Sequence, residues 1–260
     1  MSANPSSPQR RRPWKWLLLL VPLLLAAGFA AYVIIGTARN PLMPEADAAL
    51  QSSATVTVTE GDWIEFKPQT GETAVALIIY PGGLVPPAAY APLAHNIAAA
   101  GYLALIVPMP LNLAVTDINA ADKVIAAYPD IQQWAIGGHS LGGAMAASYT
   151  AQHPQQIAGL VLWASYPPDD LSSYSGQVVS IYGSNDGLAQ PADIEASRAM
   201  LPPNTVFVAL EGGNHTQFGW YGRGLQSGDN PATLSRAAQQ QQILENTVNL
   251  LATLAAKETR

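Results

Sequence analysis

The feature that most constrains the fold of this chain is the stretch Gly138-His139-Ser140-Leu141-Gly142-Gly143, which follows the apolar run Trp134-Ala135-Ile136. It matches the G-x-S-x-G pattern, in which a serine stands on a sharp turn between a strand and a helix. Such a turn brings backbone segments close together, so its neighbours must be small, and glycines flank Ser140 on both sides. The alanine-rich stretch that follows predicts a helix whose first N–H groups point at developing negative charge.

Strand and helix signals alternate along the rest of the chain. Residues 75–80 are continuously apolar, as expected of a strand buried on both faces, and residues 88–100 predict an alanine-rich helix that ends at Gly101. A hairpin of residues 54–59 and 63–66 precedes them. This alternation predicts an α/β fold with a mostly parallel central sheet and helices on both faces. Further strands are expected over 102–107, 134–138, 157–164, 178–182 and 206–210, and further helices over 119–128, 141–152, 192–201 and 237–256.

Residues 17–36 form an almost wholly apolar run, close to the roughly 20 residues that cross the hydrocarbon core of a bilayer. Residues 10–12 are arginines and Lys15 follows them, so the positive-inside rule predicts a cytoplasmic N-terminus and an extracytoplasmic body. The alternative is a cleaved signal peptide and a secreted protein. Its apolar region is usually about 7–15 residues, and the cleavage site near Thr37-Ala38 is poor. We therefore expect an uncleaved signal-anchor helix in the cell membrane.

The 260 residues suit one domain with an appendage. We divide them into a cytoplasmic basic segment (1–16), a transmembrane helix (17–36), a linker (37–53) and an α/β domain (54–260). The linker assignment rests on Pro41, Pro44 and a scarcity of anchoring apolar residues.

Composition excludes several classes of function. The net charge is -6 and no basic patch occurs in the body of the chain, which argues against a nucleic-acid partner. The chain has no cysteine, which rules out disulfides, thiol nucleophiles and cysteine-based zinc sites. We expect neither a metal nor an organic cofactor.

A serine nucleophile needs a base, and the base needs an orienting acid. In an open α/β sheet, reactive groups gather beyond the carboxyl ends of the strands. His215, directly after the expected strand 206–210, is the histidine in such a place. By contrast, His139 adjoins the serine, His95 lies within a helix and His153 lies at a helix end.

Asp186 follows the expected strand 178–182 and is the predicted orienting acid. Its rivals are Asp169, Asp170 and Asp193, of which the last begins a helix, where an acid favours the helix dipole in any case. The chain order Ser140, Asp186, His215 is the order of the nucleophile-elbow architecture. For the oxyanion hole we expect the N–H groups of Leu141 and Leu84, with Gly83 as the alternative to Leu84.

Taken together, these residues resemble the α/β-hydrolase superfamily, and more narrowly the compact bacterial serine hydrolases related to dienelactone hydrolases (α/β hydrolase family 5). The stretches that carry the likeness are Tyr80-Pro81-Gly82-Gly83, Gly138-His139-Ser140-Leu141-Gly142-Gly143, Tyr182-Gly183-Ser184-Asn185-Asp186-Gly187 and Gly212-Gly213-Asn214-His215. Three features depart from relatives. The dienelactone hydrolases proper use cysteine as the nucleophile, Pro81 stands where many lipases have histidine, and residues 165–177 leave no room for a lid domain.

The expected reaction is cleavage of a small-molecule carboxylic ester, or a related acyl bond, through an acyl-enzyme on Ser140. Thioesterase and acyltransferase chemistry use the same triad and stay open, as does a non-catalytic envelope binding protein built on a hydrolase scaffold. The residues that we expect to line a substrate pocket are Gly83, Met109, Asn112, Trp163, Tyr166 and Phe218.

Overall fold

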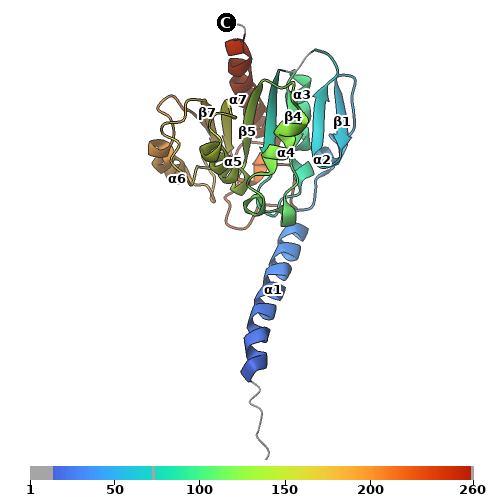
Figure 1. The fold of residues 1–260 in the computed structure, drawn as a ribbon, viewed down its shortest axis with the longest axis vertical. Helices are drawn as coiled ribbons and strands as arrows, with labels where there is room; N and C mark the ends of the chain where they lie inside the picture. Colours follow the sequence, from blue (N-terminus) through green and yellow to red (C-terminus); the bar gives the residue numbers. More distant parts are fainter. Residues whose placement is uncertain (1–13, 72–73, 259–260) are drawn as a thin grey trace, which may run out of the picture.

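An eight-stranded β-sheet forms the centre of the computed structural model, which describes residues 14–71 and 74–258. Helices cover both faces of the sheet, and one long helix, α1 (Trp14–Ala38), projects away from the body (Figure 1). The predicted basic residues 10–12 lie outside the described residues.

The sheet has the order β1-β2-β4-β3-β5-β6-β7-β8. The hairpin β1–β2 is antiparallel, β2 pairs antiparallel with β4, and all later pairs are parallel, as the alternation of elements predicted. The strands are β1 (Val56–Glu60), β2 (Ile64–Pro68), β3 (Val75–Tyr80), β4 (Leu103–Ile106), β5 (Gln133–His139), β6 (Gly159–Trp163), β7 (Gln177–Gly183) and β8 (Val206–Leu210). Their carboxyl ends, from β3 onward, share one edge of the sheet.

Two apolar cores lie on opposite faces of the sheet. In β3 every residue is buried, with Leu77 and Ile79 in the core shared with α3 (Ala91–Ala99) and α7 (Arg236–Glu258). Ile78 and Tyr80 belong to the core shared with α4 (Ala120–Ala127) and α5 (Leu141–Gln152). Because successive side chains of a strand point to opposite faces, a continuous apolar run is what a two-sided core requires.

Two predicted helices are interrupted near one end. The expected helix 88–100 begins as a 3-10 turn, Pro87–Tyr90, and becomes α3 only at Ala91, where Pro92 fits the first turn. The expected helix 192–201 is α6 (Pro191–Ala196) followed by a 3-10 turn, Ser197–Met200. Short 3-10 turns commonly form at helix ends, where the last backbone groups lack partners within the helix.

The segment predicted as a linker is packed on the body instead. It contains a short helix, α2 (Pro44–Ala48), in which Ala46 is fully buried. Leu42 forms an isolated β-bridge with Tyr221, and the Gly222 N–H donates to the Pro41 carbonyl at 2.9 Å. The segment therefore joins α1 to the body through specific contacts, which its prolines and few apolar residues did not indicate.

Candidate active site

Ser140 stands on the turn between β5 and α5 with φ 53° and ψ -123°, a region that L-residues rarely occupy. Holding a residue there costs of order 1–3 kcal/mol, which the surrounding structure must offset. A Cβ on Gly138 or on Gly142 would overlap the Tyr80 carbonyl oxygen at the end of β3. The glycines of the motif thus let the nucleophile turn pass against the neighbouring strand.

Backbone hydrogen bonds hold the turn in place. The Ser140 N–H donates to the Trp163 carbonyl at 3.0 Å, and the Ser140 carbonyl accepts from the Ala144 N–H at 3.0 Å and from the Ser165 hydroxyl at 2.8 Å. Ser140 lines a pocket of about 260 Å³ together with Leu141, Ser165, Tyr166, Leu188 and His215. The serine hydroxyl is therefore presented to a small cavity at the carboxyl edge of the sheet.

His215 and Asp186 form a buried pair, in which His215 Nδ1 lies 2.8 Å from Asp186 Oδ2. The other carboxylate oxygen, Oδ1, accepts the N–H groups of Leu188 at 2.8 Å and Ala189 at 2.7 Å. An ionised carboxylate only accepts, so Nδ1 carries the imidazole proton and Nε2 has a free lone pair. Within the described chain, His215 Nε2 is buried without a hydrogen-bond partner and does not hydrogen-bond Ser140 Oγ.

The rival acids and histidines have other roles. Asp169 accepts the Ser148 hydroxyl at 2.5 Å, Asp170 accepts the Ser172 N–H, and Asp193 completes the capping box of α6. His95 packs edge-on against Phe66, and His153 stacks on Tyr149. Of these residues, the structure brings only Asp186 and His215 together beside Ser140.

The loop that carries His215 is held by Asp229, a residue that the sequence analysis missed. Asp229 accepts the N–H groups of His215 at 3.3 Å and Thr216 at 2.8 Å, the Thr216 hydroxyl at 2.6 Å, and the Gly187 N–H at 3.1 Å. It thereby ties the base loop to the loop after Asp186. No motif marks Asp229, because it lies in an irregular segment well beyond the histidine.

Helix α7 supports the same loop from behind. Gln239 is fully buried, accepting the Asn214 N–H at 3.0 Å and donating to the Asn214 carbonyl at 2.7 Å. Gln240 donates to the Gln217 carbonyl at 2.6 Å. Two of the consecutive glutamines of this helix therefore satisfy backbone groups that flank the base, and Gln241 instead donates to Glu245 at 2.9 Å.

His139 fills the space behind the base. Its ring centroid lies 4.4 Å from that of His215, and its ring stacks on Phe218 at 5.5 Å. Its Nδ1 pairs with the Tyr90 hydroxyl at 2.9 Å, and that hydroxyl accepts the Gly82 N–H. Burial lowers the pKa of His139 well below its usual range, and the neighbouring His215 acts in the same direction. His139 is therefore a neutral packing surface for the base.

The oxyanion prediction is wrong for Leu84 in this structure. The Leu84 N–H donates to the Asn112 carbonyl at 2.7 Å, and Leu84 adopts a positive φ of 59°. Within the described residues, the N–H groups of Gly83 and Leu141 have no acceptor. A Cβ on Gly83 would lie 3.2 Å from Leu141 Cδ2, so the two residues are neighbours. Gly83, the alternative, is the residue with a free donor beside Leu141.

The predicted pocket residues divide into two groups. Tyr166 lines the pocket of Ser140, and Gly83 lines an adjoining cleft. Trp163, Met109 and Phe218 are wrong as pocket residues because their side chains are buried in the cores, and the Trp163 Nε1 donates to Thr247 at 3.2 Å. The Asn112 carbonyl accepts the Leu84 N–H, and the Asn112 side chain donates to Thr37 Oγ1, so neither group lines the pocket of Ser140. Apolar residues at strand ends are ambiguous between core and pocket in a sequence.

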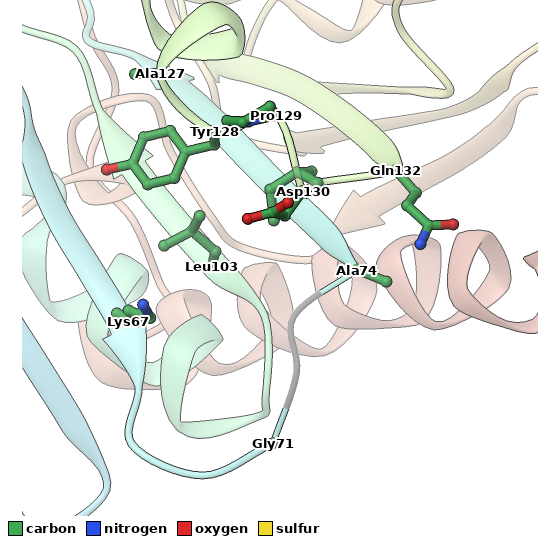
Figure 2. Close-up of a pocket in the computed structure, with 10 residues that line it drawn as sticks. Lys67, Gly71, Ala74, Leu103, Ala127, Tyr128, Pro129, Asp130 and Gln132 are labelled. Carbon is green, nitrogen blue, oxygen red and sulfur yellow. The ribbon is translucent and has the colours of Figure 1, made fainter.

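A cavity larger than the pocket of Ser140 lies elsewhere. It measures about 750 Å³ and is lined by residues at the opposite edge of the sheet, including Lys67, Leu103, Tyr128 and Asp130 (Figure 2). None of its lining residues belongs to the Ser140, Asp186 and His215 set.

Among the described residues, no group of three or more histidine, aspartate or glutamate side chains forms a metal site.

Comparison with known proteins identifies the family of this chain. The model of the alpha/beta hydrolase family matches residues 76–241, which is more than half of the chain. The chain belongs to the alpha/beta hydrolase family. No functionally curated protein matches it.

Two solved structures are similar to this alpha/beta hydrolase. A predicted CIB-like hydrolase from Thermoplasma acidophilum aligns with a TM-score of 0.54 and 15% identity, covering 75% of this chain and 98% of that one. A thermophilic esterase from the Planctomycetes species Thermogutta terrifontis aligns with a TM-score of 0.54 and 16% identity, covering 77% and 93%. At these identities the likeness establishes the shared fold.

Proposed function

We propose that this alpha/beta hydrolase is a membrane-anchored serine hydrolase that cleaves a carboxylic ester or a related acyl bond. The observation that carries the proposal is the buried Asp186–His215 pair: His215 lines the same pocket as Ser140, and its Nε2 has no hydrogen-bond partner among the described residues. The free N–H groups of Leu141 and Gly83 lie next to that pocket. A nucleophile, an oriented base and two unused donors are the parts that acyl transfer requires.

In the proposed reaction, Ser140 Oγ attacks the acyl carbon while its proton passes to His215 Nε2. The N–H groups of Leu141 and Gly83 donate to the oxyanion, and Asp186 stabilises the imidazolium through Nδ1. As the intermediate collapses, the bond to the leaving alcohol breaks and His215 returns the proton to it. Water then repeats the sequence on the acyl-enzyme, which releases the acid and restores the serine.

The proposal is tested with a fluorophosphonate probe and intact-mass analysis of the full chain in detergent. We expect one adduct on the wild type and none on Ser140→Ala, with Ser172→Ala, an exposed serine, as the matched control that keeps the adduct. Turnover of a short-chain nitrophenyl ester should disappear in the same variant. Absence of both adduct and turnover in the folded wild type would favour a non-catalytic binding protein. Faster transfer from a thioester, or to an alcohol, would redirect the proposal to those chemistries.

The anchoring part of the proposal rests on α1. The span Leu20–Ala38 has 19 residues and a mean hydropathy of 2.1, and its last turn contacts the body, which a discarded signal segment does not require. Because the chain has no cysteine, one reporter cysteine at exposed Glu60 tests the topology. A membrane-impermeant maleimide should label Glu60→Cys on intact cells, and should not label Ser2→Cys. Loss of α1 from the mature protein would overturn anchoring.

A further inference from the structure

The end of α1 is fastened to the loops of the active site. Asn40 Nδ2 donates to the Leu84 carbonyl at 3.0 Å, and Asn112 Nδ2 donates to Thr37 Oγ1 at 3.4 Å. A Cβ on Gly36 would overlap the Leu84 side chain, so helix and loop are in close contact. The apolar span continues to Ala38, which leaves no spacer between it and these contacts. At 1.5 Å per residue, the active-site loops begin within a few ångströms of the end of the span.

A cleft separates this end of α1 from the catalytic pocket. It measures about 510 Å³ and lies between Tyr32 and Gly36 of α1, the Gly83–Leu84 loop, and residues 222–227 after the base. Leu141 lines both this cleft and the 260 Å³ pocket of Ser140. The two spaces therefore meet at the residue that supplies an oxyanion donor.

Exposed apolar side chains are concentrated at the same edge of the sheet. In the described part of the body, outside α1, the exposed large apolar residues are Leu111, Val115, Tyr166, Val206 and Leu225. All except Val206 lie in segments that follow the carboxyl ends of strands. Helix α1 leaves the body at this edge, where Asn40 and Gly36 contact Leu84 in the loop after β3 (Figure 1). Val206 begins β8, at the opposite edge. Arg39 and Arg223, both exposed, also line the cleft and suit the phosphate region of a membrane surface.

We propose that the catalytic edge rests on the bilayer that holds α1, and that the substrate is a membrane amphiphile whose long acyl chain passes from the bilayer into the cleft beside α1. This inference depends on the proposed serine hydrolase and its anchor. Exposed apolar side chains gathered at one edge are unfavourable in water, whereas contact with lipid removes them from water. The cleft leads the chain past Leu141 and brings the ester carbonyl to Ser140.

The orientation is tested without any need for activity. Single cysteines at Val115 and Val206, which are 53% and 57% exposed, carry an environment-sensitive fluorophore in the full chain reconstituted in lipid nanodiscs. We expect a blue-shifted emission and quenching by lipid-attached nitroxides for Val115→Cys, and a water-like emission for Val206→Cys. Equal quenching at the two positions, or none at Val115, would overturn the orientation.

The substrate class is tested with paired substrates, a long-chain acyl ester dissolved in the bilayer and a short-chain ester in water. Val115→Asp should reduce turnover of the bilayer ester about fivefold or more, because a carboxylate is unfavourable at the lipid surface. It should leave the water-soluble ester within about twofold, and Val206→Asp should change neither. Equal effects of the two aspartates, or no preference of the wild type for the bilayer ester, would overturn the proposal.

The route through the cleft has its own variant. Gly224 lines the cleft, and a Cβ there meets no atom within 4 Å, as is also true of Gly61 in the distant hairpin turn. We expect Gly224→Trp to slow the bilayer ester selectively and Gly61→Trp to have no effect. An unchanged rate in Gly224→Trp would exclude this route. If the wild type fails to turn over either ester and takes no fluorophosphonate, the hydrolase proposal fails, while the quenching experiment still decides the orientation.

Discussion

The two edges of the sheet differ in what their loops contain. Among the described residues, every non-glycine residue with a positive φ lies in a loop at the carboxyl edge, after β3, β4, β5 or β6: Leu84, Leu111, Asn112, Ser140 and Ala164. The opposite edge holds the larger cavity, about 750 Å³, and none of its lining residues is strained in this way. Strain persists only where the surrounding structure enforces it, and here the strained residues, unlike the larger cavity, lie at the edge that holds the proposed site.

Hydrogen-bonded polar side chains also differ between the two edges, with Asp186 and Gln239 buried and Asp229 half-buried at the carboxyl edge. At the carboxyl edge, backbone N–H groups donate to Asp186, Asp229 and Gln239, and these hydrogen bonds hold the acid and the loop that carries His215. At the other edge, the Tyr128 hydroxyl donates to Glu65 and accepts from Trp63 Nε1, and this group is half-buried. The first network orients a reactive side chain, whereas the second joins a hairpin to the end of α4. Substitutions at the two edges should therefore separate activity from stability.

The largest effect is expected from Asp186→Asn. An amide in place of the carboxylate no longer selects the Nδ1–H tautomer and no longer stabilises the imidazolium, so kcat for a short-chain ester should fall about 10⁴-fold. The fold should persist, as judged by circular dichroism. Asp193→Asn, the matched aspartate in the α6 capping box, should stay within about twofold of wild type. Activity within tenfold of wild type in Asp186→Asn would break the assignment of the acid.

A smaller effect is expected from Asp229→Ala. Four donors that fix the base loop lose their acceptor, and displacement of a catalytic group by about 1 Å can lower the rate about 10²-fold. Both kcat and the rate of fluorophosphonate labelling should fall about 10–100-fold, and Asp229→Asn, which keeps an acceptor oxygen, should recover part of each. A loss of stability with no change in the labelling rate would reduce Asp229 to a structural role.

Because His139 is buried with a lowered pKa, we expect the stability of the fold to depend on pH. Its folded pKa lies well below its unfolded value of 6.5, so below that pH the unfolded chain binds the proton and the folded chain does not. The contribution of His139 to the free energy of unfolding should therefore be complete above pH 6.5. On acidification below that pH, the free energy of unfolding should fall by up to about 1.4 kcal/mol per pH unit. Denaturant unfolding from pH 7.5 to 5 measures this slope. It should flatten in His139→Gln, and an identical slope in that variant would contradict the account.

The smallest effect on activity is expected at the other edge, from Tyr128→Phe. Loss of two half-buried hydrogen bonds should reduce the free energy of unfolding by about 1 kcal/mol. Ester turnover should remain within about twofold, because Tyr128 lines the large cavity and not the catalytic pocket. A tenfold fall in kcat/KM with unchanged stability would mean that the 750 Å³ cavity takes part in function.

Much of the architecture was predictable because its signals are local. The apolar run of residues 75–80 is β3 without a change of boundary, and the hairpin and the parallel order follow from the alternation of elements. The turn that carries Ser140 could be predicted because only glycines fit beside the Tyr80 carbonyl oxygen. Those glycines, Gly138 and Gly142, lie within one five-residue motif. His215 and Asp186 each follow a strand, and the structure places them 2.8 Å apart.

What the sequence determined by itself is therefore the set of strands, the elbow and the order of its serine, acid and histidine, since short-range sterics and hydrophobic periodicity act on neighbouring residues. Only the tertiary structure decided which backbone donors are free. The Leu84 N–H is occupied because Asn112, from the next loop, reaches it, and Gly83 is left unpaired. It also decided that Asp229 supports the base and that α1 ends beside the cleft that adjoins the pocket of Ser140. These are contacts between distant segments, whose partners depend on how the whole chain packs and are not encoded in any local pattern.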